Sequence, residues 1–260
     1  MKKNSQKRTL KKEEEEDEME KFLGKDKIIG RPIKLNQVEL LPRKGKDYTE
    51  VVYLGDVHFG SPQCDEERLF RMIDYCVEKN IYVFLMGDLI DLATRYSIGA
   101  GVYEQRMNPA KQVEKIVEIL SPLAKKHLII GFLNGNHEER AYKESGINVG
   151  AFMARELNTR FLGYACWNLF RVGKENYTVY TWHGVSSARF EWTKIKAAVD
   201  TANSFDCDLF AMGHVHTLAN TAQLRQYVDL RSKTVKESKK IILITGHYLK
   251  YDRGKKGIAS

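Results

Sequence analysis

Two short apolar runs, each ending in glycine and aspartate, constrain the possible folds of this chain more than any other feature. Residues 51–54 are followed by Gly-Asp-Val-His, and residues 81–86 are followed by Gly-Asp-Leu-Ile-Asp. Runs of four to eight β-branched and aromatic residues predict buried strands. A segment of helical spacing at 65–78 lies between them, which predicts parallel strands of an α/β sheet.

The polar residues after these runs predict a ligand site. Open α/β sheets bind ligands at the carboxyl ends of their strands. Carboxylates and an imidazole placed there resemble the start of a metal site. The residues concerned are Asp56, His58, Asp88 and Asp91.

Three further apolar runs end in polar residues in the same way. Residues 127–133 lead to Asn-Gly-Asn-His-Glu, residues 177–182 lead to His-Gly, and residues 209–212 lead to Gly-His-Val-His. Five of the seven histidines lie at strand ends, and only His127 and His247 fall outside these clusters. Scattered structural histidines would not be expected to sort in this way. The added candidates are Asn136, His137, His183, His214 and His216.

The remaining spacing predicts the elements that connect these strands. A helix is expected to begin at Pro109, and residues 92–108 form a long loop of the kind that often borders a substrate. The other expected elements are a helix at 150–157, a hairpin of 167–172 with 177–182, a helix at 190–202, and strands at 219–228 and 240–245.

Length and composition predict one catalytic domain at residues 49–250. A chain of 260 residues with 43% hydrophobic content can bury a sizeable core. Residues 1–27 are highly charged and are expected to be disordered or a solvated helix, either a solubilising tail or a docking arm. Residues 28–48 are expected to form a strap or an edge strand, and 251–260 a basic tail.

Charge and cysteine content indicate which partners and which cellular compartment to expect. The formal charge of +8 favours polyanionic partners, including nucleic acid. The four cysteines form no Cys-x-x-Cys pair, which argues against a zinc knuckle or a disulfide scaffold. No apolar run is long enough to cross a bilayer, and residues 1–27 lack the apolar core of a signal peptide. A reducing, cytoplasmic setting is therefore expected.

The order of the polar clusters resembles the signature of the calcineurin-like metallophosphoesterase superfamily. That signature is Asp-x-His, Gly-Asp-x-x-Asp, Gly-Asn-His-Asp/Glu, His, and Gly-His-x-His, and all five blocks occur here between Asp56 and His216. Each block alone is weak evidence, whereas five in order are highly specific. The resemblance implies an α/β fold, an αββα sandwich of two mixed β-sheets flanked by helices. It also implies a binuclear metal-dependent hydrolase of phosphoesters.

The resemblance assigns metal ligands to these residues. Asp88 would bridge two divalent ions about 3.5–4 Å apart, which share a hydroxide nucleophile for in-line attack. Mixed imidazole and carboxylate ligation suits manganese, with iron, zinc or nickel as alternatives, better than calcium. Alternation along Gly-His-Val-His predicts that its two histidines point to the same side of an extended segment. The first metal would be held by Asp56, His58 and His216, and the second by Asn136, His183 and His214.

The family assigns the remaining histidine to the reacting phosphate. A protonated His137 could stabilise charge and protonate the departing alkoxide. Asp91 would orient His137, as a carboxylate does in other dyads. The alternative for Asp91 is a helix N-cap. For the ligand set as a whole, the alternative is ordinary polar loop residues.

The substrate is less constrained than the reaction. Protein serine/threonine phosphatases of this superfamily carry arginines that bind the phosphate dianion, in Asp-Arg-Gly and before Gly-Asn-His-Glu. Here Leu92 and Asn134 stand at those positions, which favours a phosphodiesterase or nuclease. Other arginines of this chain could take over the binding of the phosphate, so a protein phosphatase is the alternative. The candidate substrate-binding arginines are Arg95, Arg140 and Arg189.

Aromatic and basic residues near the predicted site suit binding of single-stranded nucleic acid or nucleotides. The alternative is that the aromatic residues pack in the core and the lysines form a solvated helix face. The residues concerned are Tyr96, Tyr103, Arg106, Phe190, Trp192, Lys194 and Lys196.

Two other classes of protein are alternatives to a phosphoesterase. A non-catalytic scaffold of the same fold would have lost some of the predicted metal ligands, and none is lost. A hydrolase of lipid-linked pyrophosphates would need an apolar patch that the sequence does not identify.

Overall fold

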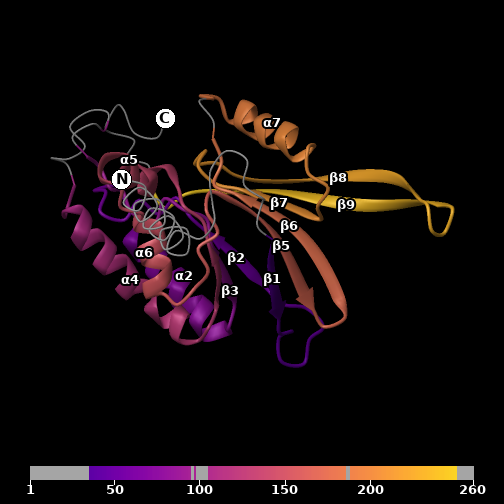
Figure 1. The fold of residues 1–260 in the computed structure, drawn as a ribbon, viewed down its shortest axis with the longest axis horizontal. Helices are drawn as coiled ribbons and strands as arrows, with labels where there is room; N and C mark the ends of the chain where they lie inside the picture. Colours follow the sequence, from indigo (N-terminus) through magenta and orange to yellow (C-terminus); the bar gives the residue numbers. More distant parts are fainter. Residues whose placement is uncertain (1–34, 95–96, 98–104, 186–187, 251–260) are drawn as a thin grey trace, which may run out of the picture. The chain divides into compact units, whose positions relative to one another are not determined.

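The computed structural model describes residues 35–94, 97, 105–185 and 188–250 (Figure 1). The expectations for residues 1–27 and 251–260, and for Arg95, Tyr96 and Tyr103, lie outside the described residues. Within the described chain, no helix is long and apolar enough to cross a membrane.

The larger sheet has six strands in the order β1-β5-β6-β7-β9-β8. β1 pairs parallel to β5, β6 parallel to β7, and β7 parallel to β9, while the β5–β6 and β8–β9 pairs are antiparallel. The sheet is therefore mixed. Its strands are β1 (Leu35–Leu40), β5 (Ala165–Val172), β6 (Glu175–Trp182), β7 (Leu209–Met212), β8 (Leu218–Asp229) and β9 (Thr234–Thr245).

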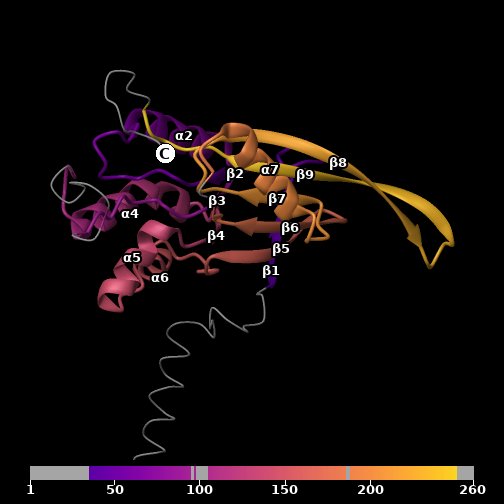
Figure 2. The same cartoon turned by 90° about the horizontal axis from the view of Figure 1, so that it is seen from above.

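The smaller sheet has three parallel strands, β2 (Val51–Leu54), β3 (Tyr82–Leu85) and β4 (Ile129–Phe132). Helices α2 (Glu66–Lys79), α4 (Pro109–Lys125) and α6 (Val149–Glu156) gather beside it, and α7 (Glu191–Ala202) lies beside β8 and β9 (Figures 1 and 2). Two sheets flanked by helices confirm the predicted fold class.

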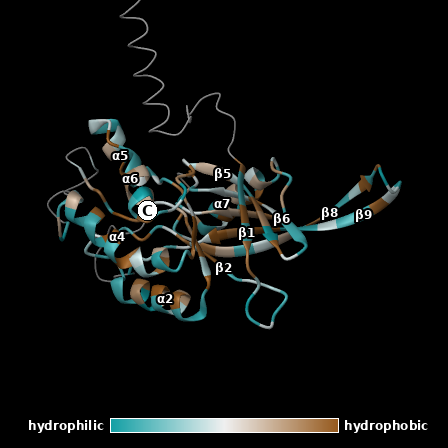
Figure 3. Ribbon diagram, turned by 60° about the horizontal axis from the view of Figure 1, so that its bottom comes forward, coloured by the Kyte–Doolittle hydropathy of each residue, from teal (hydrophilic) through white to brown (hydrophobic). Residues whose placement is uncertain are grey.

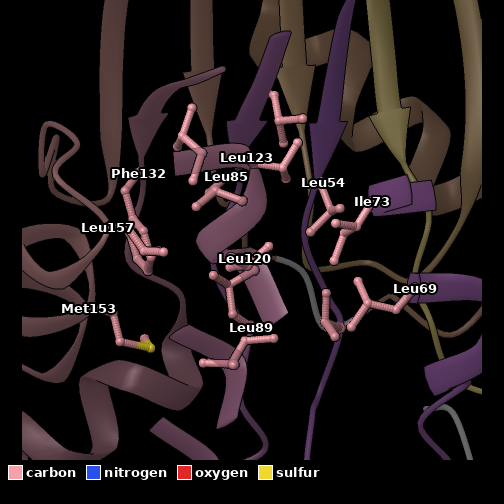
Figure 4. Packing of buried hydrophobic residues seen from close by; sticks show 14 of the residues in the cluster. Leu54, Leu69, Ile73, Leu85, Leu89, Leu120, Leu123, Phe132, Met153 and Leu157 are labelled. Atoms are coloured by element: carbon pink, nitrogen blue, oxygen red, sulfur yellow. The ribbon is translucent and has the colours of Figure 1, made fainter. Parts of the chain in front are cut away.

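Alternation along β3 explains how the smaller sheet is buried on both faces. Val83 and Leu85 pack in one apolar cluster with residues of α2, α4 and α6, and Figure 4 shows part of this packing. Phe84 and Met86 point to the opposite face and pack in a second cluster with residues of the larger sheet. Successive side chains of a strand point to opposite faces, so one short apolar run serves both cores. Helices α2 and α4 show both polar and apolar colours, as one-sided burial requires (Figure 3).

Buried Asn36 on β1 joins the two sheets. Its amide Nδ2 donates to Asn168 Oδ1 on β5 at 3.0 Å and to the Ile130 carbonyl on β4 at 3.3 Å. Its Oδ1 accepts a hydrogen bond from Arg160 at 2.9 Å. Both polar ends of a side chain that is only 2% exposed are thus satisfied, as burial of an amide requires.

Truncating Phe84 should test the packing between the sheets. The ring is fully buried, so Phe84→Ala is expected to lower the free energy of unfolding by about 3–5 kcal/mol. Urea denaturation followed by circular dichroism measures this loss. Phe70→Ala on the exposed side of α2 is the control and should cost much less. Equal losses in the two variants would contradict this account of the core.

Two elements differ from their predicted form. Asn136 begins helix α5 (Asn136–Ser145), where the sequence predicted only a polar loop after the strand. The β8–β9 hairpin is longer than expected, with twelve paired residues on each strand. Both extensions are polar on at least one face, so apolar spacing alone did not reveal them.

Candidate metal centre

Polar side chains from the carboxyl ends of five strands meet at one place. Within the described residues, three groups of potential ligands have donor atoms within 4.8 Å of one another. In two of the groups, residues more than a hundred positions apart in the chain come together. The groups are Asp56, His58 and His216; His58, Asp91 and His137; and Asp88, His183 and His214.

The first group places three predicted ligands in contact. The Nε2 atoms of His58 and His216 lie 2.9 Å apart, and His216 Nε2 lies 3.5 Å from Asp56 Oδ1. Asp56 is fully buried and also accepts the backbone N–H of His214. A buried carboxylate and two imidazole nitrogens that converge at such short range offer the donor set of a divalent cation.

The second group centres on His183. Its Nε2 lies 3.4 Å from Asp88 Oδ2 and 3.1 Å from Asn136 Oδ1. Its Nδ1 donates to the Met86 carbonyl at 2.8 Å, which directs Nε2 toward the oxygens of Asp88 and Asn136, where a ligating nitrogen would lie. A second hydrogen bond of this kind is typical of metal-ligating histidines. His214 Nδ1 lies 2.8 Å from the same Asn136 oxygen.

The backbone of this site is held in an uncommon conformation. Five of the predicted ligands have φ between 48° and 68°, in the left-handed region that non-glycine residues rarely adopt. Each such residue costs of the order of 1–3 kcal/mol, and such strain clusters at functional sites. The left-handed segment also differs from the extended one predicted for Gly-His-Val-His. These residues are Asp56, His58, Asp88, His214 and His216.

Backbone hydrogen bonds between neighbouring loops maintain this conformation. The N–H groups of Val57 and His58 both donate to the Asp88 carbonyl, at 2.8 Å and 3.0 Å. A Cβ on Gly87, where φ is 88°, would lie 2.6 Å from the backbone nitrogen of Gly135. The loops after β2, β3 and β4 therefore approach each other too closely for a side chain at that point.

Glu138 is a residue of the site that the sequence did not single out. Its carboxylate is fully buried and accepts backbone N–H groups of Asp88 at 2.9 Å, Leu89 at 2.8 Å and Gly135 at 2.9 Å. Burial, followed by the nearby Asp88 carboxylate, raises the pKa of Glu138. The sequence feature that could have indicated this residue is the glutamate at the fourth position of Gly-Asn-His-Glu. We infer that Glu138 shapes the turn that presents Asp88.

The Glu138→Gln variant tests this positioning. Glutamine has one oxygen acceptor and places an N–H₂ group against backbone donors, so the turn should relax. We expect metal affinity or activity to fall about 10- to 100-fold, the usual effect of removing a partner behind the ligands. Metal titration by calorimetry and phosphoester turnover measure the two quantities. Glu118→Gln on the exposed face of α4 is the control and should change neither. An unchanged Glu138→Gln variant would contradict the assignment.

His137 lies between the two groups. Its Nδ1 is within hydrogen-bond distance of the Asp91 carbonyl, and its Nε2 lies 3.8 Å from Asp88 Oδ2. The Asp91 carboxylate is shared, since Oδ1 lies 3.6 Å from Nδ1 of both His137 and His58. Among the described residues Asp91 caps no helix, because the next helix along the chain is capped by Asn108.

A chain of amides holds the Asp91 carboxylate in place. Gln105 Nε2 donates to Asp91 Oδ2 at 2.8 Å, and Gln112 Nε2 donates to Gln105 Oε1 at 2.9 Å. Gln112 lies fully buried on α4, and its Oε1 accepts the backbone N–H of Leu92 at 2.9 Å. These two glutamines therefore orient the residue predicted to orient His137.

Opposite charges set the protonation of the site. Burial opposes ionisation of Asp88, yet the imidazoles of His183 and His137 bring its pKa well below the usual value. Burial likewise disfavours the charged form of His183, but the Asp88 carboxylate raises its pKa to about 10. Burial, His58 and Arg140 outweigh Asp88 at His137 and lower its pKa to about 4. The free protein thus holds a neutral His137 at neutral pH.

The predicted arginines are placed differently. Arg140 lies beside His137, with its guanidinium nitrogens 3.1 Å and 3.3 Å from the two ring nitrogens. Arg189 is exposed just before α7, and no hydrogen bond or ion pair joins it to the described site residues. Arg95 lies outside the described residues.

His247 belongs to the neighbourhood of the site, although the sequence analysis placed it outside. Its ring centroid lies 5.2 Å from that of His216. Burial and His216 lower its pKa to about 4. The signal was present, because His247 follows the end of β9 just as the other histidines follow their strands.

Comparison with known proteins agrees with this geometry. The family model described as calcineurin-like phosphoesterase matches residues 49–251. None of the curated proteins compared with the chain matches it.

Three solved structures are distantly similar. A conserved protein of Streptococcus pneumoniae TIGR4, described as a predicted phosphoesterase, is 13% identical, with a TM-score of 0.32 over 79% of this chain and 76% of that chain. Vacuolar Protein Sorting 29 from Cryptosporidium parvum is 15% identical, with a TM-score of 0.34 over 76% and 73%. A metallophosphoesterase from Sphaerobacter thermophilus is 14% identical, with a TM-score of 0.34 over 79% and 79%.

Proposed function

Because the chain belongs to the calcineurin-like phosphoesterase family, we propose that it is a hydrolase of phosphodiesters, with nucleotides or nucleic acid as the candidate substrates. The observation that carries the proposal is the meeting of two candidate ligand groups on either side of His137. One group centres on Asp56 and His216, and the other on Asp88 and His183. A phosphoryl group bound between them would lie against His137.

The residues present fit two divalent metals. Each group combines a buried carboxylate with imidazole nitrogens, and the hydrogen bond of His183 Nδ1 to Met86 directs its Nε2 atom into the site. When bound, such ions would polarise the phosphoryl oxygens and lower the pKa of an attacking water. Manganese is our first proposal for their identity, with iron, zinc or nickel as alternatives. Asp88 as the shared ligand is likewise a proposal.

His137 is our candidate for proton transfer to the leaving group. The Asp91 carbonyl accepts from Nδ1, so Nε2 is the atom that faces the site. Its pKa of about 4 in the free protein would rise when an anionic phosphate lies beside it, because a nearby negative charge favours the imidazolium. Arg140 would contact the same phosphate and return the site to near neutrality.

The surroundings of the site favour a diester over a monoester. At the two positions where protein phosphatases carry arginines, Leu92 is buried and Asn134 is 4% exposed. Asn134 Nδ2 donates to Glu139, so that position offers no cation. Arg140 is the one described arginine in contact with His137, and a singly charged diester needs less clamping than a dianion. Arg140 also keeps a phosphoprotein monoesterase as the second candidate.

A substrate panel tests the proposal. Purified protein with added manganese would be offered an aryl diester, an aryl monoester, a cyclic nucleotide and single-stranded DNA. We expect the aryl diester to be cleaved faster than the monoester, and at least one nucleotide substrate to be cleaved. Faster monoester cleavage would favour the phosphatase instead. No turnover with any of the four proposed metals would contradict both. The cytoplasmic location expected from the cysteines stays a prediction.

A further inference from the structure

The far half of the β8–β9 hairpin extends beyond the sheet. β7 pairs with β9 only along Ile241–Ile244, whereas β8 and β9 stay paired out to Asp229 and Thr234. Figures 1 and 2 show the hairpin reaching past its neighbouring strands. We call residues 223–240 the arm. Within the described residues the arm is a ribbon of two strands, and isolated ribbons of this kind are marginally stable in water.

The arm exposes apolar side chains that a lone ribbon would be expected to avoid. Leu224 and Val228 lie on one face of β8, and Val235 is the cross-strand partner of Val228 on that face. Together with Leu230 in the turn, these side chains are between 61% and 85% exposed. A cluster of exposed apolar side chains marks an interaction surface.

Only one of the two edges of the arm is open to strand pairing. The outer part of β9 carries Lys236 and Lys239, and lysines on an edge oppose pairing with another strand. β8 carries neither lysine nor proline along its twelve residues. It is also the edge strand of the whole six-stranded sheet. The β8 edge therefore lacks the usual protection.

The register identifies which backbone groups face outward. Gly246 N donates to the Thr217 carbonyl, so this pair is a hydrogen-bonded pair of the β8–β9 ladder. Such pairs alternate along an antiparallel ladder. Consequently the backbone groups of Leu224, Gln226 and Val228 point away from β9, toward the open edge.

We propose that the β8 edge pairs with the β8 edge of a second copy of this chain, antiparallel, about a twofold axis at Tyr227. This register sets Arg225 opposite the partner's Asp229, and Leu224 opposite the partner's Leu230. Because of the twofold axis, each of these contacts occurs twice in the dimer. The result is a four-stranded sheet in which the apolar side chains of the two copies lie side by side on one face.

Charge favours this register over the one centred two residues earlier, which keeps the same faces together. Moving the axis to Arg225 would place that arginine against its own copy, and like charges directly opposite are destabilising. Within its own chain Arg225 already pairs with Asp206, and Asp229 with Lys236. The new contacts would extend these pairs into a network. Exposed ion pairs contribute little energy, so they would set register rather than affinity.

Engineered disulfides test the register. At the twofold axis the two copies of residue 227 form a non-hydrogen-bonded pair, with Cα atoms about 4.5 Å apart. That separation lies within reach of a disulfide. The Tyr227→Cys variant should therefore form a covalent dimer on oxidation, visible on a non-reducing gel. In Arg225→Cys the two copies would lie about 13 Å apart and should stay separate. The four native cysteines are buried, and none belongs to the arm.

Light scattering across a dilution series tests the association itself. The wild-type protein should show twice the monomer mass, and Val228→Lys should restore the monomer. Ile147→Lys, another exposed apolar residue before α6, should remain a dimer. A wild-type monomer at every concentration, a dimeric Val228→Lys variant, or equal cross-linking of the two cysteine variants would overturn the proposal. None of these sites belongs to the metal centre, so diester turnover checks folding in each variant.

Discussion

Asp88→Asn should lower turnover of bis(p-nitrophenyl) phosphate by at least about 10³-fold, because it removes the charge at the centre of the site. Asp88 Oδ2 lies 3.4 Å from His183, and Oδ1 accepts the backbone N–H of His137 at 2.8 Å. The amide is nearly the same size, so the fold should persist. Initial rates with added manganese measure the first effect, and elemental analysis of bound metal per chain measures the loss of ligation.

Asp74→Asn provides the matched control for that experiment. Asp74 lies exposed on α2, and the same chemical change there should leave rate and metal content unaltered. Circular dichroism of both variants establishes that they are folded. If repurified Asp88→Asn protein kept its turnover, Asp88 could not be a shared ligand of the two ions.

His137→Ala should retain bound metal but slow the reaction by about 10²–10⁴-fold, the usual contribution of a positioned acid or base. The loss should depend on the leaving group. A p-nitrophenolate leaves without a proton, whereas an alkoxide needs one, so a diester with an alkyl leaving group should suffer more. Rates for one aryl and one alkyl diester, measured in the wild type and the variant, give this difference directly.

His127→Ala is the control for the histidine change. His127 is exposed after α4, before the amino end of β4, whereas the site residues follow the carboxyl end of that strand, so its removal should leave both rates intact. An equal loss for aryl and alkyl substrates would argue that His137 acts on the phosphoryl group rather than on the leaving group. Loss of metal in His137→Ala would instead make it a ligand.

The candidate metal centre could be anticipated because its predicted ligands follow a local rule. Each apolar run of four to seven residues is followed closely by a polar residue, and parallel strands bring those ends to one edge. Asp56, Asp88 and His183 all obey this rule. His247 also obeys it, because it follows the end of β9 by two residues.

Other parts of the site depend on contacts that no local pattern encodes. Apart from its place in Gly-Asn-His-Glu, nothing in the local sequence separates Glu138 from a solvent-exposed glutamate. Its role comes from the hydrogen bond that its buried carboxylate accepts from the backbone N–H of Asp88. Gln105 and Gln112 meet Asp91 because α4 packs against the sheet, which is a tertiary event. The left-handed backbone at His214 and His216 replaced a predicted extended segment, since hydrogen bonds from neighbouring loops outweigh local preference.

The place of β1 has a practical consequence for anyone who trims this chain. The match to the family begins at residue 49, but Leu35–Leu40 pairs with residues 167–172 of β5 and contributes a fully buried Leu40. A protein expressed from residue 49 would leave the backbone N–H and C=O groups of β5 that pair with β1 without their partners. Asn168 would also lose its hydrogen bond with Asn36. We expect such a fragment to aggregate through this exposed strand edge, so a recombinant protein should keep the residues from 35 onward.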